Sequence, residues 1–143
     1  MNHILVVGGG KAGVAISQEV LEAGKSVVIL EHRAEQAEEI RPRLAGATVL
    51  IGSGTNIDDL DAAGIRNCAM FVACTGSDET NLVAASLAKH EFHVSLVVAR
   101  LVDRRNAWLY RPELGVDRVL DEASVFVEPI RVLLAASGGV ESE

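Results

Sequence analysis

The chain has 143 residues, of which 49% are hydrophobic and 23% charged, and its formal net charge is −7 at pH 7. This length fits one ordinary domain, and the negative charge argues against a nucleic acid partner, because phosphate binding needs a basic face. No stretch approaches the roughly 18 apolar residues of a membrane span. The N-terminus leads straight into a predicted strand and has no basic region followed by a longer apolar segment, so we expect no membrane insertion, no signal peptide and a cytoplasmic location.

The N-terminal segment follows the order of a dinucleotide-binding unit. An apolar strand is predicted at 3–8, the segment Gly-Gly-Gly-Lys-Ala-Gly occupies 8–13, and a helix follows at about 12–23. A second apolar strand at 26–31 ends on Glu31. Strand, GxGxxG, helix, strand and acid is the arrangement that holds the pyrophosphate and ribose of a dinucleotide. The sequence therefore predicts nucleotide binding.

Each residue of this unit has a physical task. Gly8 allows the tight turn off the strand, Gly10 leaves room for a pyrophosphate beside the backbone, and Gly13 lets the helix pack closely. The helix N-terminus offers free N–H groups and a partial positive charge to the phosphates. Glu31 can accept hydrogen bonds from ribose hydroxyls, which favours NAD(H) and adenine nucleotides over NADP(H). The alternatives are a solvated charge at Glu31 and a 2′-phosphate contact by Arg33.

Apolar runs and helical patterns alternate through the rest of the chain. Further strands are predicted at 47–51, 69–74, 94–99 and 117–120. Further helices are predicted at 34–45, where Pro42 kinks or shortens the last turn, between Asn56 and Gly64, and at 78–90, 103–111 and 123–136. Such alternation indicates a parallel sheet covered on both faces. We therefore predict an α/β fold: a Rossmann-like, doubly wound parallel six-stranded sheet in the order 3-2-1-4-5-6.

Glycine-rich and polar loops follow the predicted strands. Ligands of a doubly wound sheet bind outside the carboxyl ends of the strands, where the strand order reverses. We therefore expect one crevice between the first and fourth strands. The residues predicted to bind a cofactor there are Gly8, Gly9, Gly10, Lys11, Ala12, Gly13, Glu31, Gly52, Ser53, Gly54, Thr55, Thr75 and Gly76, with Ser77 beside them. Arg100 follows four apolar strand residues and points either to this crevice or to a dimer interface.

The cysteines and histidines do not suggest a metal or a catalytic site. Cys68 and Cys74 lack metal-ligand spacing and make no disulfide framework, and Cys74 is expected to be buried. His90 and His93 straddle the end of a predicted helix, where surface histidines are far commoner than ligands. No histidine or Tyr-x-x-x-Lys pair occupies a crevice loop. We therefore predict no metal and no catalytic residue.

Several motifs together resemble a known family. They are segment 8–13, Glu31, segment 52–55, Leu-Asp-Ala-Ala-Gly-Ile at 60–65, Ala-Cys-Thr-Gly-Ser-Asp-Glu-Thr-Asn at 73–81, and Ala99-Arg100. Over about residues 2–120 the chain resembles the N-terminal nucleotide-binding domain of potassium-transport regulators. These are the Trk and Ktr uptake subunits and the RCK domains of potassium channels and efflux systems, also called KTN or TrkA-N domains. Through this match Asp78, Asn81 and Arg100 join the predicted cofactor-binding residues; for Asp78 the alternative is a helix-dipole role alone.

The resemblance implies a function as well as a fold. It implies reversible binding of NAD(H), or alternatively of ATP, ADP or AMP, with no chemistry performed on them. It also implies a homodimer or higher even oligomer, with the last helix packed on a partner subunit. The further partner is a membrane-embedded potassium transporter or channel subunit. We therefore expect a cytoplasmic regulatory sensor that is peripheral to the inner membrane through that partner.

The chain departs from the usual pattern of the family at two positions. Lys11 stands where the fingerprint usually has Arg, which keeps the positive charge but loses the bidentate fork, and Ser53 stands where Asp is usual. The second, ligand-sensing domain of the family is absent, so we expect a free-standing subunit or an excised module. We divide the chain into a nucleotide-binding domain at 1–136 and a disordered tail at 137–143.

Two other functions stay open on the residues alone. They are a small NAD-dependent oxidoreductase, which needs an acid or base near the nicotinamide and normally a second domain, and a nucleotide-binding module without a regulatory role. Segment 123–136 carries apolar side chains that a domain of this size has little core to cover, and such patches mark interfaces. We therefore expect a homodimer formed partly through this segment. Its apolar residues are Val125, Phe126, Ile130, Val132, Leu133 and Leu134.

Overall fold

Six parallel strands form the centre of the molecule. A computed structural model of the chain describes residues 2–137. The strands are β1 (His3–Val7), β2 (Val27–Glu31), β3 (Thr48–Ile51), β4 (Cys68–Ala73), β5 (Val97–Leu101) and β6 (Arg118–Asp121). They pair in the order β3-β2-β1-β4-β5-β6, so the predicted fold class and strand order are confirmed. The order reverses at β1, which pairs with β2 on one side and with β4 on the other.

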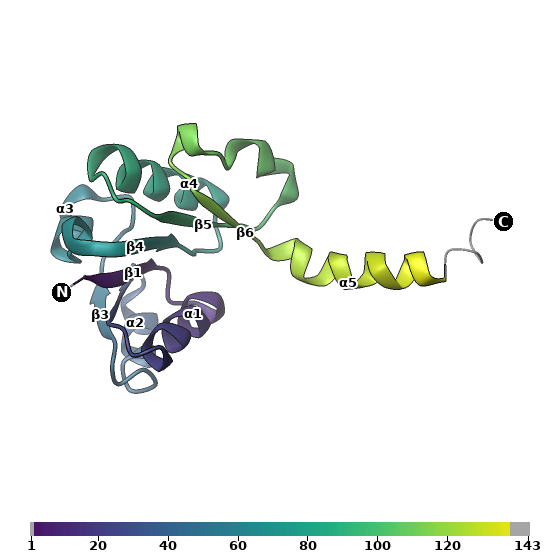
Figure 1. Ribbon diagram of the computed structural model, residues 1–143. Helices are drawn as coiled ribbons and strands as arrows, with labels where there is room; N and C mark the ends of the chain where they lie inside the picture. Colours follow the sequence, from purple (N-terminus) through teal and green to yellow (C-terminus); the bar gives the residue numbers. More distant parts are fainter. Residues whose placement is uncertain (1, 138–143) are drawn as a thin grey trace.

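Helices cover the two faces of this sheet (Figure 1). They are α1 (Lys11–Glu22), α2 (Ala34–Ile40), α3 (Ile57–Ala62) and α4 (Asp78–Ser86); a further helix, α5 (Glu122–Ala136), follows β6. Alternate side chains of β1 point to opposite faces: Leu5 and Val7 pack in a core with α3 and α4, while Ile4 and Val6 pack in a second core with α1 and α2. Both faces of the central strands are therefore buried, which explains their almost continuous apolar sequence.

Three predicted helices differ in length or type from what the structure has. The helix expected at 34–45 ends at Ile40, in keeping with the interior Pro42, although Leu44 stays buried. The helix expected at 78–90 ends at Ser86 and continues as a π-helical turn to Glu91. The segment expected to be an α-helix at 103–111 forms a 3₁₀ helix, Arg104–Leu109, with no buried residue in that range. Without an apolar face to bury, the α-helical form has little tertiary support.

The fifth strand begins later than predicted. The apolar pattern places it at 94–99, but β5 starts at Val97. The Nζ of Lys89 donates hydrogen bonds to the carbonyl oxygens of Val94 (2.8 Å) and Ser95 (3.2 Å). His93 has a positive φ of 57°, which turns the chain just before these residues. Val94 and Ser95 therefore close the end of the preceding helix and do not belong to the sheet.

The last helix, α5, projects away from the sheet domain (Figure 1). Along its 15 residues from Glu122 to Ala136 none is buried, and Pro129 lies in its interior. The expected helix at 123–136 is thus present with its apolar side chains exposed; Phe126 is 72% exposed. Within residues 2–137, no helix combines the length and apolar character needed to cross a membrane. Of the tail expected at 137–143, residues 138–143 lie outside the described part.

Candidate functional site

A cavity of about 620 Å³ opens at the carboxyl ends of the strands, where the strand order reverses. This volume is within the range of small-molecule sites, about 300–1,000 Å³. Loops after β1, β2, β3 and β4 and one side chain of β5 line it. The predicted residues that line it are Gly8, Gly10, Glu31, Gly52, Ser53, Gly54, Thr55, Thr75, Gly76, Ser77 and Arg100. Residues from distant parts of the sequence therefore meet in one crevice, as predicted.

The glycine-rich loop needs glycine at specific positions. Gly8 has a φ of 110°, and a Cβ there would lie 2.7 Å from the carbonyl oxygen of Cys74. A Cβ at Gly13 would lie 1.8 Å from the carbonyl oxygen of Gly8, so only glycine lets α1 pack this closely on the loop. A Cβ at Gly10 would meet nothing within 4 Å, because this residue faces the open cavity. The loop thus leaves space at Gly10, beside the N-terminus of α1, where an anion is favoured.

Glu31 ends β2 and is only 2% exposed. One carboxylate oxygen accepts the N–H of Gly9 at 2.7 Å, and the other accepts the N–H and the Nε of Arg33 at 2.8 and 2.9 Å. Burial acts to raise the pKa of Glu31, but the hydrogen bonds and the charge of Arg33 outweigh it and lower the pKa. Glu31 is therefore a buried, ionised group held by its own chain, unlike the solvated strand-end charge considered above.

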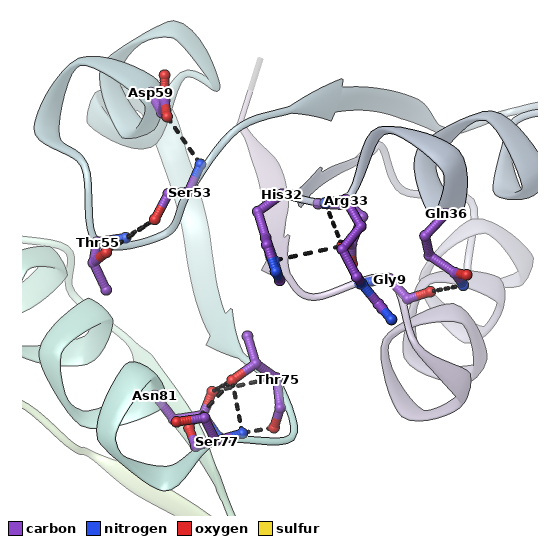
Figure 2. A network of polar contacts seen from close by, with 11 residues as sticks. Gly9, His32, Arg33, Gln36, Ser53, Thr55, Asp59, Thr75, Ser77 and Asn81 are labelled. Atoms are coloured by element: carbon purple, nitrogen blue, oxygen red, sulfur yellow. Dashed lines mark hydrogen bonds and ion pairs between the residues drawn. The ribbon is translucent and has the colours of Figure 1, made fainter.

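The loop after β3 is held by Asp59 on α3 and by its own polar groups. Asp59 accepts the N–H of Ser53 at 2.9 Å, and the Oγ of Ser53 accepts the N–H of Thr55 at 3.1 Å. A Cβ at Gly54 would come within 2.3 Å of Val7, so the loop lies close against the end of β1. Figure 2 shows Ser53 and Thr55 apart from His32 and Arg33, with Thr75 and Ser77 on a third segment.

The loop after β4 is clamped by Asn81. This side chain is fully buried; its Oδ1 accepts the N–H of Thr75 at 2.9 Å, and its Nδ2 donates to the carbonyl oxygens of Thr75 and Arg100, both at 3.1 Å. Arg100 in turn donates to the carbonyl oxygen of Thr75 at 3.2 Å and through Nε to Glu122 at 2.8 Å. Arg100 therefore connects the crevice with the first residue of α5.

Asp78 fixes a neighbouring segment. Its carboxylate accepts four hydrogen bonds of 2.7 to 2.9 Å, from the N–H groups of Val102 and Asp103, the amide of Asn106 and the hydroxyl of Tyr110. Burial acts to raise the pKa of Asp78, but these hydrogen bonds together lower it. A helix-dipole role alone, the alternative considered for Asp78, does not account for these contacts.

Six of the predicted residues lie beside the cavity and do not line it: Gly9, Lys11, Ala12, Gly13, Asp78 and Asn81. Gly9 donates to Glu31 and accepts from Gln36 at 2.7 Å (Figure 2). Lys11 is exposed at the start of α1, and Ala12 packs towards the second core. Most of these residues support the lining loops from outside the cavity. A sequence motif does not distinguish such supporting residues from residues that contact a ligand directly.

Six lining residues were not among the predicted ones: Val7, Leu30, His32, Arg33, Cys74 and Thr80. Val7, Leu30 and Cys74 are apolar residues that directly precede predicted lining residues, so extending each predicted segment by one residue would have found them. His32 and Arg33 directly follow Glu31, and both line the cavity, so the expectation that no histidine occupies a crevice loop is wrong for His32. Thr80 follows the cap Ser77 by three residues, and its backbone N–H donates to the Oγ of Ser77 at 3.2 Å.

The cavity offers binding groups and few groups for proton transfer. Burial raises the pKa of the Cys74 thiol, so little thiolate forms at neutral pH. The carboxylate of Glu31 accepts hydrogen bonds from Gly9 and Arg33, and guanidinium groups do not act as bases. No cluster of three or more potential metal-binding side chains occurs within residues 2–137.

The chain matches a family model and curated relatives. The TrkA-N domain model matches residues 4–122. The Trk system potassium uptake protein TrkA of Mycobacterium tuberculosis is 32% identical over 114 residues, which cover 80% of this chain and 51% of that protein. The TrkA homolog of Methanothermobacter thermautotrophicus is 29% identical over 118 residues, covering 82% of this chain and 53% of that protein. The chain spans about half the length of the curated relatives it matches.

Solved structures share the fold at low sequence identity. The TrkA-N domain of the inner membrane protein ybaL from Escherichia coli has a TM-score of 0.81 at 19% identity, covering 93% of this chain and 96% of that one. The GsuK channel bound to NAD has a TM-score of 0.76 at 17% identity, covering 87% and 22%. The Shewanella denitrificans Kef CTD in AMP-bound form has a TM-score of 0.72 at 24% identity, covering 97% and 81%.

Proposed function

The chain belongs to the TrkA-N domain family, and from this premise we propose that it is a regulatory nucleotide-binding module. Its proposed ligand is NAD(H), or alternatively ATP, ADP or AMP. Its proposed output is control of a membrane-embedded potassium transporter or channel subunit, to which it attaches from the cytoplasm. Residues 1–136 form the proposed domain.

The open space at Gly10 is the observation that carries this proposal. It lies beside the N-terminus of α1 in a cavity of about 620 Å³, and a Cβ at Gly10 would meet nothing within 4 Å. A pyrophosphate can approach the backbone there and face the positive end of the helix dipole. The proposed ligand contacts come from the lining loops, with the phosphates at Gly10, a ribose towards Glu31, and the remaining groups between Ser53 and Thr75.

The names of related proteins support the regulatory part. Two relatives of similar sequence are named as Trk system potassium uptake proteins. Two proteins of similar fold are described as bound to NAD and to AMP. Since the chain spans about half the length of the two Trk relatives, their transport role comes to this chain only as a proposal.

Binding without turnover fits the chemistry of the lining residues. A dehydrogenase needs a group that exchanges a proton with its substrate near the nicotinamide. The buried carboxylate of Glu31 is ionised and hydrogen-bonded, and the raised pKa of Cys74 keeps that thiol protonated. His32 is 68% exposed, on the rim of the cavity. We therefore propose that the ligand is sensed and not converted.

The assembly proposed for this module is a homodimer through α5. The helix exposes Phe126 to 72% and Val125 to 69%, so its apolar side chains lack cover within the monomer. A second copy of the chain would bury them, as the family resemblance implies. Arg100 joins the crevice to Glu122 at the start of α5, which gives the ligand a direct physical connection to the proposed interface.

The test is calorimetric titration of the purified, nucleotide-stripped protein with NAD, NADH, ATP, ADP and AMP in turn. We expect at least one to bind, and its affinities for two dimer arrangements to differ by about 10- to 100-fold, which is sufficient for a switch. Small-angle scattering with each bound nucleotide then reports the dimer arrangement, because a ligand that binds two arrangements equally shifts neither. Binding with no change of shape or oligomeric state would leave a module without a regulatory role; absence of binding would remove the proposal.

A further inference from the structure

The carboxylate of Glu31 has no free position for a ligand. A carboxylate has about four lone-pair sites. Its Oε2 accepts the backbone N–H of Arg33 at 2.8 Å and the Nε of Arg33 at 2.9 Å. Its Oε1 accepts the backbone N–H of Gly9 at 2.7 Å and faces the Nη2 of Arg33 at 3.4 Å. The Nδ1 of His32 also lies 3.5 Å from Oε2. A ribose can therefore reach Glu31 only by replacing one of the closer donors of Gly9 and Arg33.

The donors differ in how easily they can be replaced. The N–H groups of Gly9 and Arg33 belong to the backbone and are fixed by the fold. The Arg33 side chain, in contrast, is 56% exposed and flexible, while the Glu31 side chain is 2% exposed. Both residues line the cavity, and Figure 2 shows Arg33 close to Gly9 of the glycine-rich loop. The two sites held by the guanidinium are thus the ones that a ribose diol can take.

We propose that the guanidinium of Arg33 occupies the ribose position of the unliganded crevice and thereby selects which nucleotides bind. The inference rests on the proposed nucleotide binding and adds the identity of the selecting residue. A nucleotide with a free 2′,3′-diol must displace Arg33 before its hydroxyls reach Glu31, so the ion pair weakens its binding. A nucleotide with a 2′-phosphate is instead stabilised by the guanidinium of Arg33, because arginine pairs with phosphate through two parallel hydrogen bonds.

Glu31 and Arg33 therefore have opposite effects on ligand choice. The buried carboxylate repels a 2′-phosphate and attracts a diol. The guanidinium neutralises that repulsion and competes with the diol. With both residues present, the crevice discriminates less against a 2′-phosphate than it would with Glu31 alone. Removing Arg33 therefore restores the full preference of Glu31 for a free diol.

The experiment compares NAD and NADP, which differ only in the 2′-phosphate, by calorimetry on the wild type, Arg33→Ala and a control. The control is Arg43→Ala, which removes the same charge from an exposed position outside the lining residues. We expect Arg33→Ala to bind NAD about two- to fivefold more tightly, as for loss of one exposed ion pair, and NADP at least about fivefold more weakly. The ratio of the two affinities then shifts by about tenfold or more towards NAD, and Arg43→Ala leaves it at the wild-type value.

Other outcomes distinguish a failure of this inference from a failure of the proposed nucleotide binding. Equal weakening of NAD and NADP in Arg33→Ala would mean that Arg33 only adds positive potential, and unchanged affinities would make it a bystander; both overturn the inference and leave nucleotide binding intact. A wild type that binds no nucleotide at all overturns the proposed function and the inference with it. Circular dichroism of the variant checks that its fold is unchanged, as expected for an exposed side chain.

Discussion

Two glycines of the same loop have different physical constraints. Gly13 lies under the loop, where a Cβ would be 1.8 Å from a backbone oxygen, whereas Gly10 faces open space with a φ of −78° that alanine can adopt. The GxGxxG spacing already assigns close packing to Gly13 and ligand access to Gly10, and the structure shows the backbone contact that limits Gly13. A methyl group at Gly10 therefore has room in the unliganded protein and interferes only with a ligand.

We predict that Gly10→Ala lowers nucleotide affinity at least about tenfold, which corresponds to about 1.4 kcal/mol. Its free energy of unfolding should change by less than about 1 kcal/mol, because alanine is only a poorer N-cap than glycine. Gly13→Ala, the matched variant, should lose about 2 kcal/mol or more of stability through overpacking. Calorimetry and urea unfolding measure both effects. Normal affinity in a folded Gly10→Ala protein would place the phosphates elsewhere.

Asp78 leads to a prediction about stability and pH. Its pKa is lowered in the folded protein from an ordinary value of 3.8, so its contribution is present above that pH and is lost as the pH falls through the lower folded value. Asp78→Asn replaces one acceptor oxygen by a donor that faces other donors. We expect a loss of about 2–3 kcal/mol at pH 7, and a smaller difference from wild type in urea unfolding below about pH 3.8.

The control for this variant is Glu79→Gln, which changes an exposed carboxylate in the same first turn of α4 that lacks those contacts. It should cost only a few tenths of a kcal/mol through the helix dipole. Equal losses for the two variants, or a loss for Asp78→Asn that does not depend on pH, would contradict the role given to the Asp78 hydrogen bonds.

At the level of elements, the apolar patterns predicted the strands that are buried on both faces of the sheet. They failed where polar side chains determine the residue at which a strand begins. β1, β2 and β4 lie within one or two residues of their predicted limits, because their side chains fill two cores. β5 begins late because Lys89 binds the two carbonyl groups before it. The crevice was predictable from the loops that follow strands. The orientation of Arg33 and the clamping role of Asn81 depend on tertiary contacts that no local motif contains.

The connection between β5 and α5 gives a prediction at this scale. Glu122→Gln keeps the size of the side chain and weakens its ion pair with Arg100, which is not itself changed. We expect amide hydrogen exchange in the first turn of α5 to become about two- to fivefold faster, as for loss of one partly exposed ion pair. Glu128→Gln removes the Glu128–Arg131 pair further along the same helix and is the control. The same exchange rates at the helix start in both variants would contradict a tether at Arg100.

For the whole molecule, the exposed side of α5 predicts assembly. We expect a homodimer at micromolar concentration, and Phe126→Glu should raise its dissociation constant at least about 100-fold. Burying one phenylalanine per subunit contributes about 1.5–3 kcal/mol, and a symmetric interface counts it twice. Sedimentation equilibrium measures the mass of both proteins. A monomeric wild type, or a variant that dimerises as well as the wild type, would contradict an interface through α5.

The geometry of α5 also makes it a lever. Its 15 residues extend about 22 Å at 1.5 Å per residue. The Arg100–Glu122 pair lies at the start of the helix, beside the crevice. By the same length, a rotation of about 10° at Glu122 would move the far end by about 4 Å. Arg100 also contacts the carbonyl oxygen of Thr75, so a movement of this crevice loop that turned the start of the helix would be largest at its far end.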